Sequence, residues 1–194
     1  MTTPSIAALR RVLECITDNV TPVPDQPAVV AKMKPAFPHS ISPAPTDLSP
    51  AIPVGAYNCF EFAFGVAGNR KVHLISRALH STCCDGIFVA YLAESILIPV
   101  ESAANGDLVL YHDGRNYVHA GRVLGDFVLS KWGNGLLWVH GTYEVPESYG
   151  NSALYYKATK PDMVLTKFVE YAIQREGSVV SEILKPGPTS SAAP

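Results

Sequence analysis

The fold is decided by one stretch, residues 106–141, which reads GDLVLYHDGRNYVHAGRVLGDFVLSKWGNGLLWVHG. Short runs of aliphatic and aromatic side chains alternate in it with turn residues, at 113–114, 125–126 and 133–135. Apolar runs separated by two or three Gly, Asp or Asn residues are typical of antiparallel hairpins. Together with a further run at 153–158 (ALYYKA), the pattern predicts one antiparallel meander.

The two-residue turn at 125–126 also predicts a register. If Leu124 and Phe127 close this hairpin, Ser130 lies opposite Gly121 and Trp132 lies opposite His119. The Ser130 side chain then shares a face with His119, about 7 Å away on the diagonal. We therefore expect Ser130 to orient the His119 imidazole and Trp132 to shield it. Lys131 points to the other face and has no acceptor atom for a histidine proton.

His140 is a second candidate for the group that orients His119. Continuing the register across the turn at 133–135 pairs it with Val128, on the same face as His119. Strand spacing places it more than about 10 Å from His119. The pattern therefore favours Ser130, and an ordinary sheet histidine is the alternative for His140.

Helical patterns flank the meander. The run NCFEFAFGVAG, residues 58–68, predicts a buried helix with Asn58 as N-cap, Cys59 in the first turn and Gly68 as C-cap. A second helix is expected at about 84–95 and a C-terminal one from Pro161 to about 175. The first turn of a helix lowers the pKa of a cysteine, since its unpaired N–H groups favour the thiolate.

The chain is expected to consist of three parts, which are an N-terminal segment, a main domain and a C-terminal tail. Residues 1–54 contain a short amphipathic helix over 5–17, followed by a proline-rich segment that wraps the domain in extended form, apart from a turn of helix near 29–34. Residues 55–176 form the main domain, of the α+β class. Residues 177–194 have the composition of a disordered tail.

Composition excludes several function classes. The chain has 194 residues, a formal charge of −2 and scattered lysines and arginines, so no nucleic-acid partner is expected. No apolar run approaches the roughly 20 residues that span a bilayer, and no Sec signal is expected. We expect no membrane partner and a cytoplasmic protein as synthesised, with export by a non-Sec route or release by phage lysis left open.

The cysteines and histidines predict no metal site and no cofactor. Neither CxxC pairs nor zinc spacing occurs among the four cysteines, which are Cys15, Cys59, Cys83 and Cys84. Buried filler is the usual role of a lone cysteine. A nearby base favours catalysis instead, and His119, followed by the small residues Ala120 and Gly121, is the best placed of the six histidines.

The order of these features resembles the NlpC/P60 and related CHAP hydrolases, which have a papain-like fold. The matching residues are Asn58-Cys59, the strand GDLVLY at 106–111 and Val118-His119-Ala120-Gly121, within about residues 55–157. The resemblance implies a Cys59 nucleophile, His119 as base and a third polar residue on the next strand, which here is Ser130. This chain departs from the family in having Asn-Cys-Phe-Glu where Asp-Cys-Ser-Gly is usual, and serine as third residue.

The resemblance also implies an oxyanion hole made by the Cys59 N–H and an upstream polar side chain. Tyr57 is the nearest candidate, and core packing is its alternative. Asn58, Trp132 and His140 are the remaining candidates for contacts with the oxyanion or substrate.

Three functions follow as hypotheses. The first is a cysteine peptidase or amidase that acts through a Cys59 thioester, with peptidoglycan stem peptides as the family's commonest substrate. The second is a deamidase or acyltransferase effector that uses the same thioester. The third is an inactive binding domain, in which the proline-rich segment 21–53 or an aromatic run contacts a protein partner; the run consists of Trp132, Trp138, Tyr143 and Tyr149.

Overall fold

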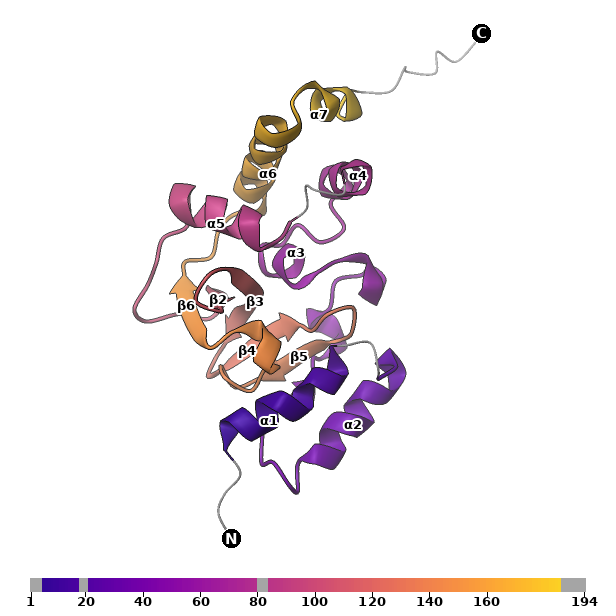
Figure 1. The fold of residues 1–194 in the computed structure, drawn as a ribbon, viewed down its shortest axis with the longest axis vertical. Helices are drawn as coiled ribbons and strands as arrows, with labels where there is room; N and C mark the ends of the chain where they lie inside the picture. Colours follow the sequence, from indigo (N-terminus) through magenta and orange to yellow (C-terminus); the bar gives the residue numbers. More distant parts are fainter. Residues whose placement is uncertain (1–4, 18–20, 80–83, 186–194) are drawn as a thin grey trace.

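A computed structural model describes residues 5–17, 21–79 and 84–185. Its centre is a six-stranded antiparallel sheet in the order β1-β5-β4-β3-β2-β6 (Figure 1). The strands are β1 (Ser42–Pro43), β2 (Leu108–His112), β3 (Tyr117–Leu124), β4 (Phe127–Lys131), β5 (Leu137–His140) and β6 (Ser152–Tyr156). The fold class is therefore α+β, as expected.

The predicted register is confirmed up to the pair of Gly121 and Ser130, but the predicted pair of Trp132 with His119 lies beyond the end of the ladder, and Tyr149 rather than Trp132 stacks on the His119 ring. Leu124 pairs with Phe127 and Gly121 with Ser130 across the tight turn. Farther along the sheet, Val128 pairs with His140. The two glycine-containing turns fix these pairings, because a loop of set length leaves one register in which both apolar faces are covered.

The expectation of one continuous meander is wrong for its last strand. β2 to β5 follow one another in the sheet, but β6 returns to pair with β2 at the opposite side. The connection through η5 (Glu147–Tyr149) carries the chain back over one face of the sheet. β2 is thereby enclosed between two strands, and its side chains are almost all buried.

Helices cover both faces. The N-terminal elements pack with η5 on one face around Trp132 and Trp138; they are α1 (Ile6–Val12), η1 (Leu13–Ile16), η2 (Val23–Asp25) and α2 (Gln26–Met33). In Figure 1, α1 and α2 lie beyond β4 and β5, away from the other helices. The expected helix over 5–17 is thus present with a 3-10 end. The expected turn of helix near 29–34 is present as the longer α2, and the proline-rich segment is otherwise less extended than expected, because η3 (Thr46–Leu48) and η4 (Val54–Ala56) form in it or directly after it.

The second face is covered by the helices that follow residue 58. They are α3 (Cys59–Ala63), α4 (Arg70–Ala78), α5 (Gly86–Ser95), α6 (Pro161–Glu176) and α7 (Ser178–Ile183). Their apolar side chains form a core with Leu108, Leu110 and Ala120 of the sheet. Figure 1 shows α3 between the sheet and the outer helices.

Several helix boundaries differ from expectation. α3 ends at Ala63 rather than near Gly68, because Gly65 takes a positive φ of 71° and turns the chain. α4 was not predicted, since its segment carries many polar residues. The ordered part also extends past residue 176, because α7 buries Val180 in the core. Residues 186–194 of the expected tail lie outside the described residues.

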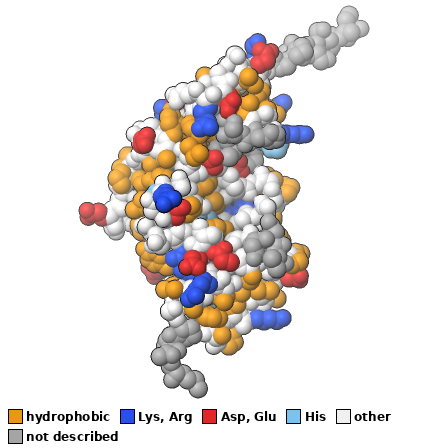
Figure 2. All heavy atoms as spheres, in the orientation of Figure 1, with side chains coloured by type: hydrophobic (Ala, Val, Ile, Leu, Met, Phe, Trp, Pro, Cys, Tyr) orange, Lys and Arg blue, Asp and Glu red, His pale blue; other side chains and the backbone are white. Residues whose placement is uncertain are grey.

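The surface carries no dominant charge in the view of Figure 2, where acidic and basic side chains are interspersed. Within the described ranges, no helix is both long and apolar enough to cross a membrane.

Candidate active site

Cys59 begins α3, held there by a full capping box. Asn58 Oδ1 accepts the Glu61 N–H at 2.9 Å, and a Glu61 carboxylate oxygen accepts the Asn58 N–H at 3.0 Å. The Asn58 Nδ2 group donates to the Cys84 carbonyl at 2.7 Å. Asn58 is therefore engaged in fixing the start of α3, and its side chain is not directed to a substrate.

The ladder between β3 and β4 stops beside this cysteine. Its last pair is Gly121 with Ser130, although the register would next place Ala120 opposite Lys131. The ladder therefore ends at the level of Ala120 and Lys131.

The Cys59 thiol lies at this end of the ladder. Val123 donates its N–H to Asp107 on the β2 side, so the alternation of peptide directions turns the Ala120 N–H toward β4. That N–H hydrogen bonds the Cys59 side chain. The sulfur therefore lies next to the backbone of His119 and Ala120, in the place that the β4 carbonyl would take in a continued ladder.

His119 is held by a chain of buried hydrogen bonds. Its Nε2 lies 3.0 Å from Ser130 Oγ, which lies 2.7 Å from His140 Nε2. Trp132 donates its indole N–H to the same hydroxyl at 3.0 Å. His140 Nδ1 lies 2.8 Å from the Gly141 carbonyl oxygen.

Only one arrangement of protons satisfies this chain when both imidazoles are neutral. A carbonyl can only accept, so His140 carries its proton on Nδ1 and its Nε2 accepts from the Ser130 hydroxyl. The hydroxyl oxygen then accepts from Trp132 and from His119, which places the His119 proton on Nε2. His119 Nδ1 is left as a lone-pair nitrogen, and it is buried without a hydrogen-bond partner among the described residues.

Tyr149 fixes the plane of this imidazole. Its ring stacks on His119 with centroids 3.8 Å apart and planes within 10°. Its hydroxyl accepts the Gly133 N–H at 2.8 Å. Tyr149 reaches the site from η5, far along the chain, and no local sequence signal marks it as a neighbour of His119.

The resting thiol and imidazole are both neutral at pH 7. Burial raises the pKa of Cys59 to about 11, despite the Ala120 hydrogen bond that lowers it. Burial also holds the pKa of His119 well below 6.5, and the His140 charge acts in the same direction. The expected lowering of the thiol pKa by a helix start is wrong, because α3 has only five residues and desolvation outweighs its weak dipole.

One other expectation about the site is wrong. Strand spacing predicts that His140 lies beyond reach of His119, but both imidazoles hydrogen bond Ser130 Oγ, because inward-pointing side chains span the separation between strand positions. Lys131 points to the face opposite Ser130, as expected, and this is the face that α3 covers. Its Nζ lies 5.0 Å from the centroid of the Tyr57 ring.

Tyr57 itself is buried in a small apolar cluster with Phe62, Leu129 and Leu137. Trp132 is fully buried and lies beside His140, with ring centroids 5.5 Å apart. The structure thus brings together His119, Ser130, Trp132 and His140 on one face of the sheet. Cys59 lies near Ala120 and Lys131 on the face that α3 covers, with Tyr57 beside Lys131, and no hydrogen bond joins Cys59 to His119 among the described residues. Cys83 and His80 lie outside the described residues.

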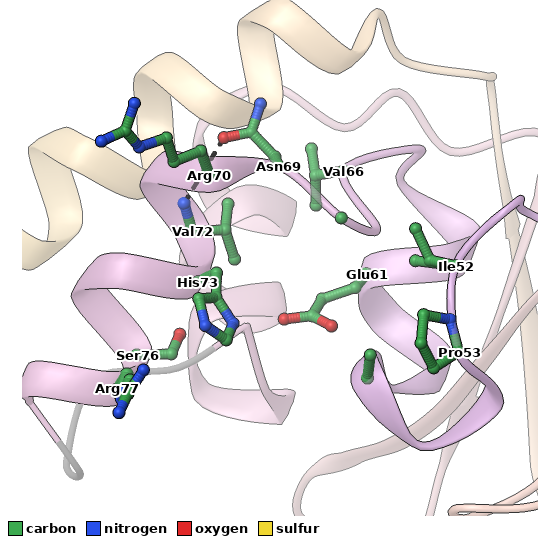
Figure 3. A pocket seen from close by; sticks show the side chains of 12 residues that line it. Ile52, Pro53, Glu61, Val66, Asn69, Arg70, Val72, His73, Ser76 and Arg77 are labelled. Atoms are coloured by element: carbon green, nitrogen blue, oxygen red, sulfur yellow. Dashed lines mark hydrogen bonds between the residues drawn. The ribbon is translucent and has the colours of Figure 1, made fainter.

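A cavity of about 430 Å³ lies on the other side of α3. It is bounded by α4 and the segment around Ile52 and Pro53, and Glu61 and His73 point toward one another across it (Figure 3). Burial raises the pKa of Glu61, and the Asn58 N–H and the His73 charge oppose this shift. Neither Cys59 nor His119 lines this cavity.

The described residues contain no group of three or more His, Cys, Asp or Glu side chains placed to hold a metal ion. Comparisons with protein-family models, curated proteins and solved structures find no significant match to this chain.

Proposed function

We propose that the chain is a cysteine hydrolase of the papain-like NlpC/P60 type, a peptidase or amidase in which Cys59 attacks an amide carbonyl. The observation that carries this proposal is the unpartnered Nδ1 of His119, fixed by Ser130 and Tyr149 one residue before Ala120, whose N–H hydrogen bonds the Cys59 side chain. A general base needs a lone pair held in one orientation, and the network supplies it.

The proposed reaction starts from the neutral pair. As the Cys59 sulfur attacks the carbonyl carbon, its proton passes to His119 Nδ1, and negative charge develops on the carbonyl oxygen. The resulting imidazolium gives this proton to the leaving amine, and the C–N bond breaks to leave a thioester. Water, deprotonated by His119, then attacks the thioester and releases the acid and the thiol.

Ser130 supports both steps as a positioning residue. Its oxygen accepts the His119 Nε2–H in the neutral state and continues to accept it in the imidazolium. The same thioester would serve deamidation or acyl transfer if another acceptor replaced water or if a glutamine side chain were the substrate. Product analysis distinguishes these reactions.

A binding domain without catalysis is the second candidate. The observation that favours it is burial: His119 is 0% exposed, and the pKa of Cys59 is about 11, so little thiolate exists at pH 7. The proline-rich segment 21–53 would then be the region to test for a protein partner.

Hydrolysis of peptides, including peptidoglycan stem peptides, by wild type, Cys59→Ala and His119→Ala tests the proposal. We expect activity to be lost in both variants and retained in Cys15→Ala, whose cysteine packs among the N-terminal apolar residues. Turnover that persists in Cys59→Ala contradicts the proposal. Absence of turnover on all amide substrates in the wild type favours the binding domain.

A further inference from the structure

We propose that the Lys131 ammonium is the cation that stabilises the Cys59 thiolate and the charge that develops when this sulfur attacks. The inference gives a role to a residue that the proposed hydrolase mechanism does not use, and its catalytic meaning rests on that proposed function. Its physical basis is the placement of Lys131 in the sheet.

Lys131 is a buried cation without a carboxylate partner. Its side chain is 0% exposed, and no salt bridge joins it to an acidic residue in the described part of the chain. Burial of an ammonium without a compensating charge costs several kcal/mol. The buried Lys131 ammonium therefore requires either a group that compensates its charge or a function that uses the charge.

The ammonium is held in place by three contacts. Nζ donates to the carbonyl of Gly133 at 3.0 Å and to that of Gly135 at 2.8 Å. It also lies 5.0 Å from the centre of the Tyr57 ring, within the range of a cation–π contact. An ammonium has three donors, so one N–H remains after the two carbonyls.

The register places this cation beside the sulfur. Lys131 is the residue that would pair with Ala120 if the β3–β4 ladder continued beyond Gly121 and Ser130. The Ala120 N–H binds the Cys59 side chain instead. Ala120 and Lys131 are neighbours in this register and both point to the face of the sheet that α3 covers, so the Cys59 side chain that binds the Ala120 N–H lies near the Lys131 side chain.

The charges of the two groups act on each other. The Lys131 charge lowers the pKa of Cys59, and the thiolate raises that of Lys131. Burial lowers the pKa of Lys131 to about 8, so the lysine is mostly protonated at pH 7, when attack takes place. The mutual dependence is the linkage expected of an ion pair that forms only when the thiol ionises.

Other groups around Cys59 do not provide this charge. His119 is neutral, and Tyr149, whose pKa burial raises, would add a negative charge if it ionised. Glu61, on the same helix, is acidic and is bound to the Asn58 N–H. The five-residue helix α3 contributes little dipole.

One turn links this cation to the base. The residues 133–135 present two carbonyls to Lys131, while the Gly133 N–H binds the hydroxyl of Tyr149, which stacks on His119. The GNG sequence thus holds the lysine and, through Tyr149, the histidine in a fixed relation. Gly133 permits the turn by adopting a φ of +50°.

Thiol reactivity tests the inference without a substrate. The rate of Cys59 alkylation by iodoacetamide is measured from pH 6 to 11 by peptide mass spectrometry in wild type and Lys131→Met. The methionine has a similar length and no charge, so the thiolate loses its counter-ion. At pH 7 we expect alkylation to slow by at least about tenfold, because a nearby opposite charge typically shifts a pKa by one unit or more.

Lys157→Met is the matched control, because it removes a half-exposed lysine whose ammonium bonds the Asp107 carboxylate rather than lying near Cys59. It should leave the Cys59 profile unchanged. A folded Lys131→Met variant that is alkylated at the wild-type rate overturns the inference.

The wild type gives a second, mutation-free test. The logarithm of the alkylation rate should rise with pH up to the pKa of Lys131, near 8, and then flatten. Above this pH the thiol loses its proton more readily, but the ammonium that stabilises the thiolate is lost to the same extent, so the two effects cancel. A single straight rise from pH 7 to 10 overturns the inference, even if Lys131→Met does not fold. A lysine-dependent thiol in a protein that cleaves no amide contradicts only the proposed hydrolase.

Discussion

Ser130 Oγ lies 2.7 Å from Nε2 of His140, and the Ser130 hydroxyl donates its proton to this nitrogen. Since His140 Nδ1 faces the Gly141 carbonyl, its Nε2 must accept. The direction of every hydrogen bond that reaches His119 follows from this one pair.

Ser130→Ala should destabilise the fold and disorder the imidazole. The indole N–H of Trp132 and one nitrogen of each histidine would lose a buried partner. Since a buried polar group without a partner costs about 1–3 kcal/mol, we expect the free energy of unfolding in urea to fall by about 3 kcal/mol. Ser95→Ala, which removes a hydroxyl bonded to its own helix, should change it by less than about 0.5 kcal/mol.

His140→Leu should change the tautomer of His119 while leaving its direct contacts in place. Without an acceptor at residue 140, the Ser130 hydroxyl can donate to His119 Nε2, which moves the histidine proton to Nδ1. Long-range ¹H–¹⁵N NMR should show Nδ1 unprotonated in the wild type and increasingly protonated in the variant. His73→Leu, which changes an exposed residue of α4, should leave the His119 spectrum unchanged.

The turnover number should fall with this change of tautomer, because the proposed base would carry a proton before attack. An unaltered His119 spectrum in His140→Leu would contradict the proton arrangement, whatever happens to activity.

Stability should fall as pH decreases below the unfolded pKa of histidine, near 6.5. Burial lowers the pKa of folded His140 to about 4. Between pH 6.5 and 4, His140 is therefore protonated in the unfolded chain and neutral in the folded chain. The stabilisation is therefore complete above pH 6.5 and is lost between about 6.5 and 4. The His140 contribution lowers the free energy of unfolding by on the order of 3 kcal/mol over the whole interval.

Urea unfolding at pH 7.5 and 5 measures this loss, and His119 adds to it in the same direction. His140→Gln, which keeps a polar side chain but cannot titrate, should show a weaker pH dependence. Equal pH dependence in the two proteins would mean that the pKa of His140 is the same in the folded and unfolded chains, which contradicts the prediction.

Gly121→Ala should disturb the contact between β3 and β4. A Cβ at this position would lie 2.7 Å from a Val128 methyl and 2.9 Å from both the Leu129 oxygen and Ser130 Cβ. We expect a loss of about 1–3 kcal/mol, typical of overpacking, by thermal or urea unfolding. Gly55→Ala is the matched control, because nothing lies within 4 Å of its Cβ position. Similar stabilities of the two variants would show that the sheet relaxes around residue 121.

Local pattern was sufficient for the elements with strong turn or capping signals. The hairpin at Gly125, the cap at Asn58 and the helix from Pro161 could be predicted, because each depends on residues adjacent in the chain. The end of α3 could not be predicted, because Gly65 and Gly68 both follow apolar residues and either could end the helix. Gly65 is surrounded by Arg122 and Pro161, which are far along the chain.

The sequence by itself determined the register that sets His119 and Ser130 on one face, because alternation along a strand and a two-residue turn leave no freedom there. Only the tertiary structure decided what surrounds them. Tyr149 lies against His119 because the chain returns to pair β6 with β2. The Cys59 thiol lies near Ala120 and Lys131 at the end of the β3–β4 ladder. Burial, a property of the whole fold, sets the charge of each group, so the ionisation of the thiol, the imidazole and the lysine could not be inferred from spacing along the chain.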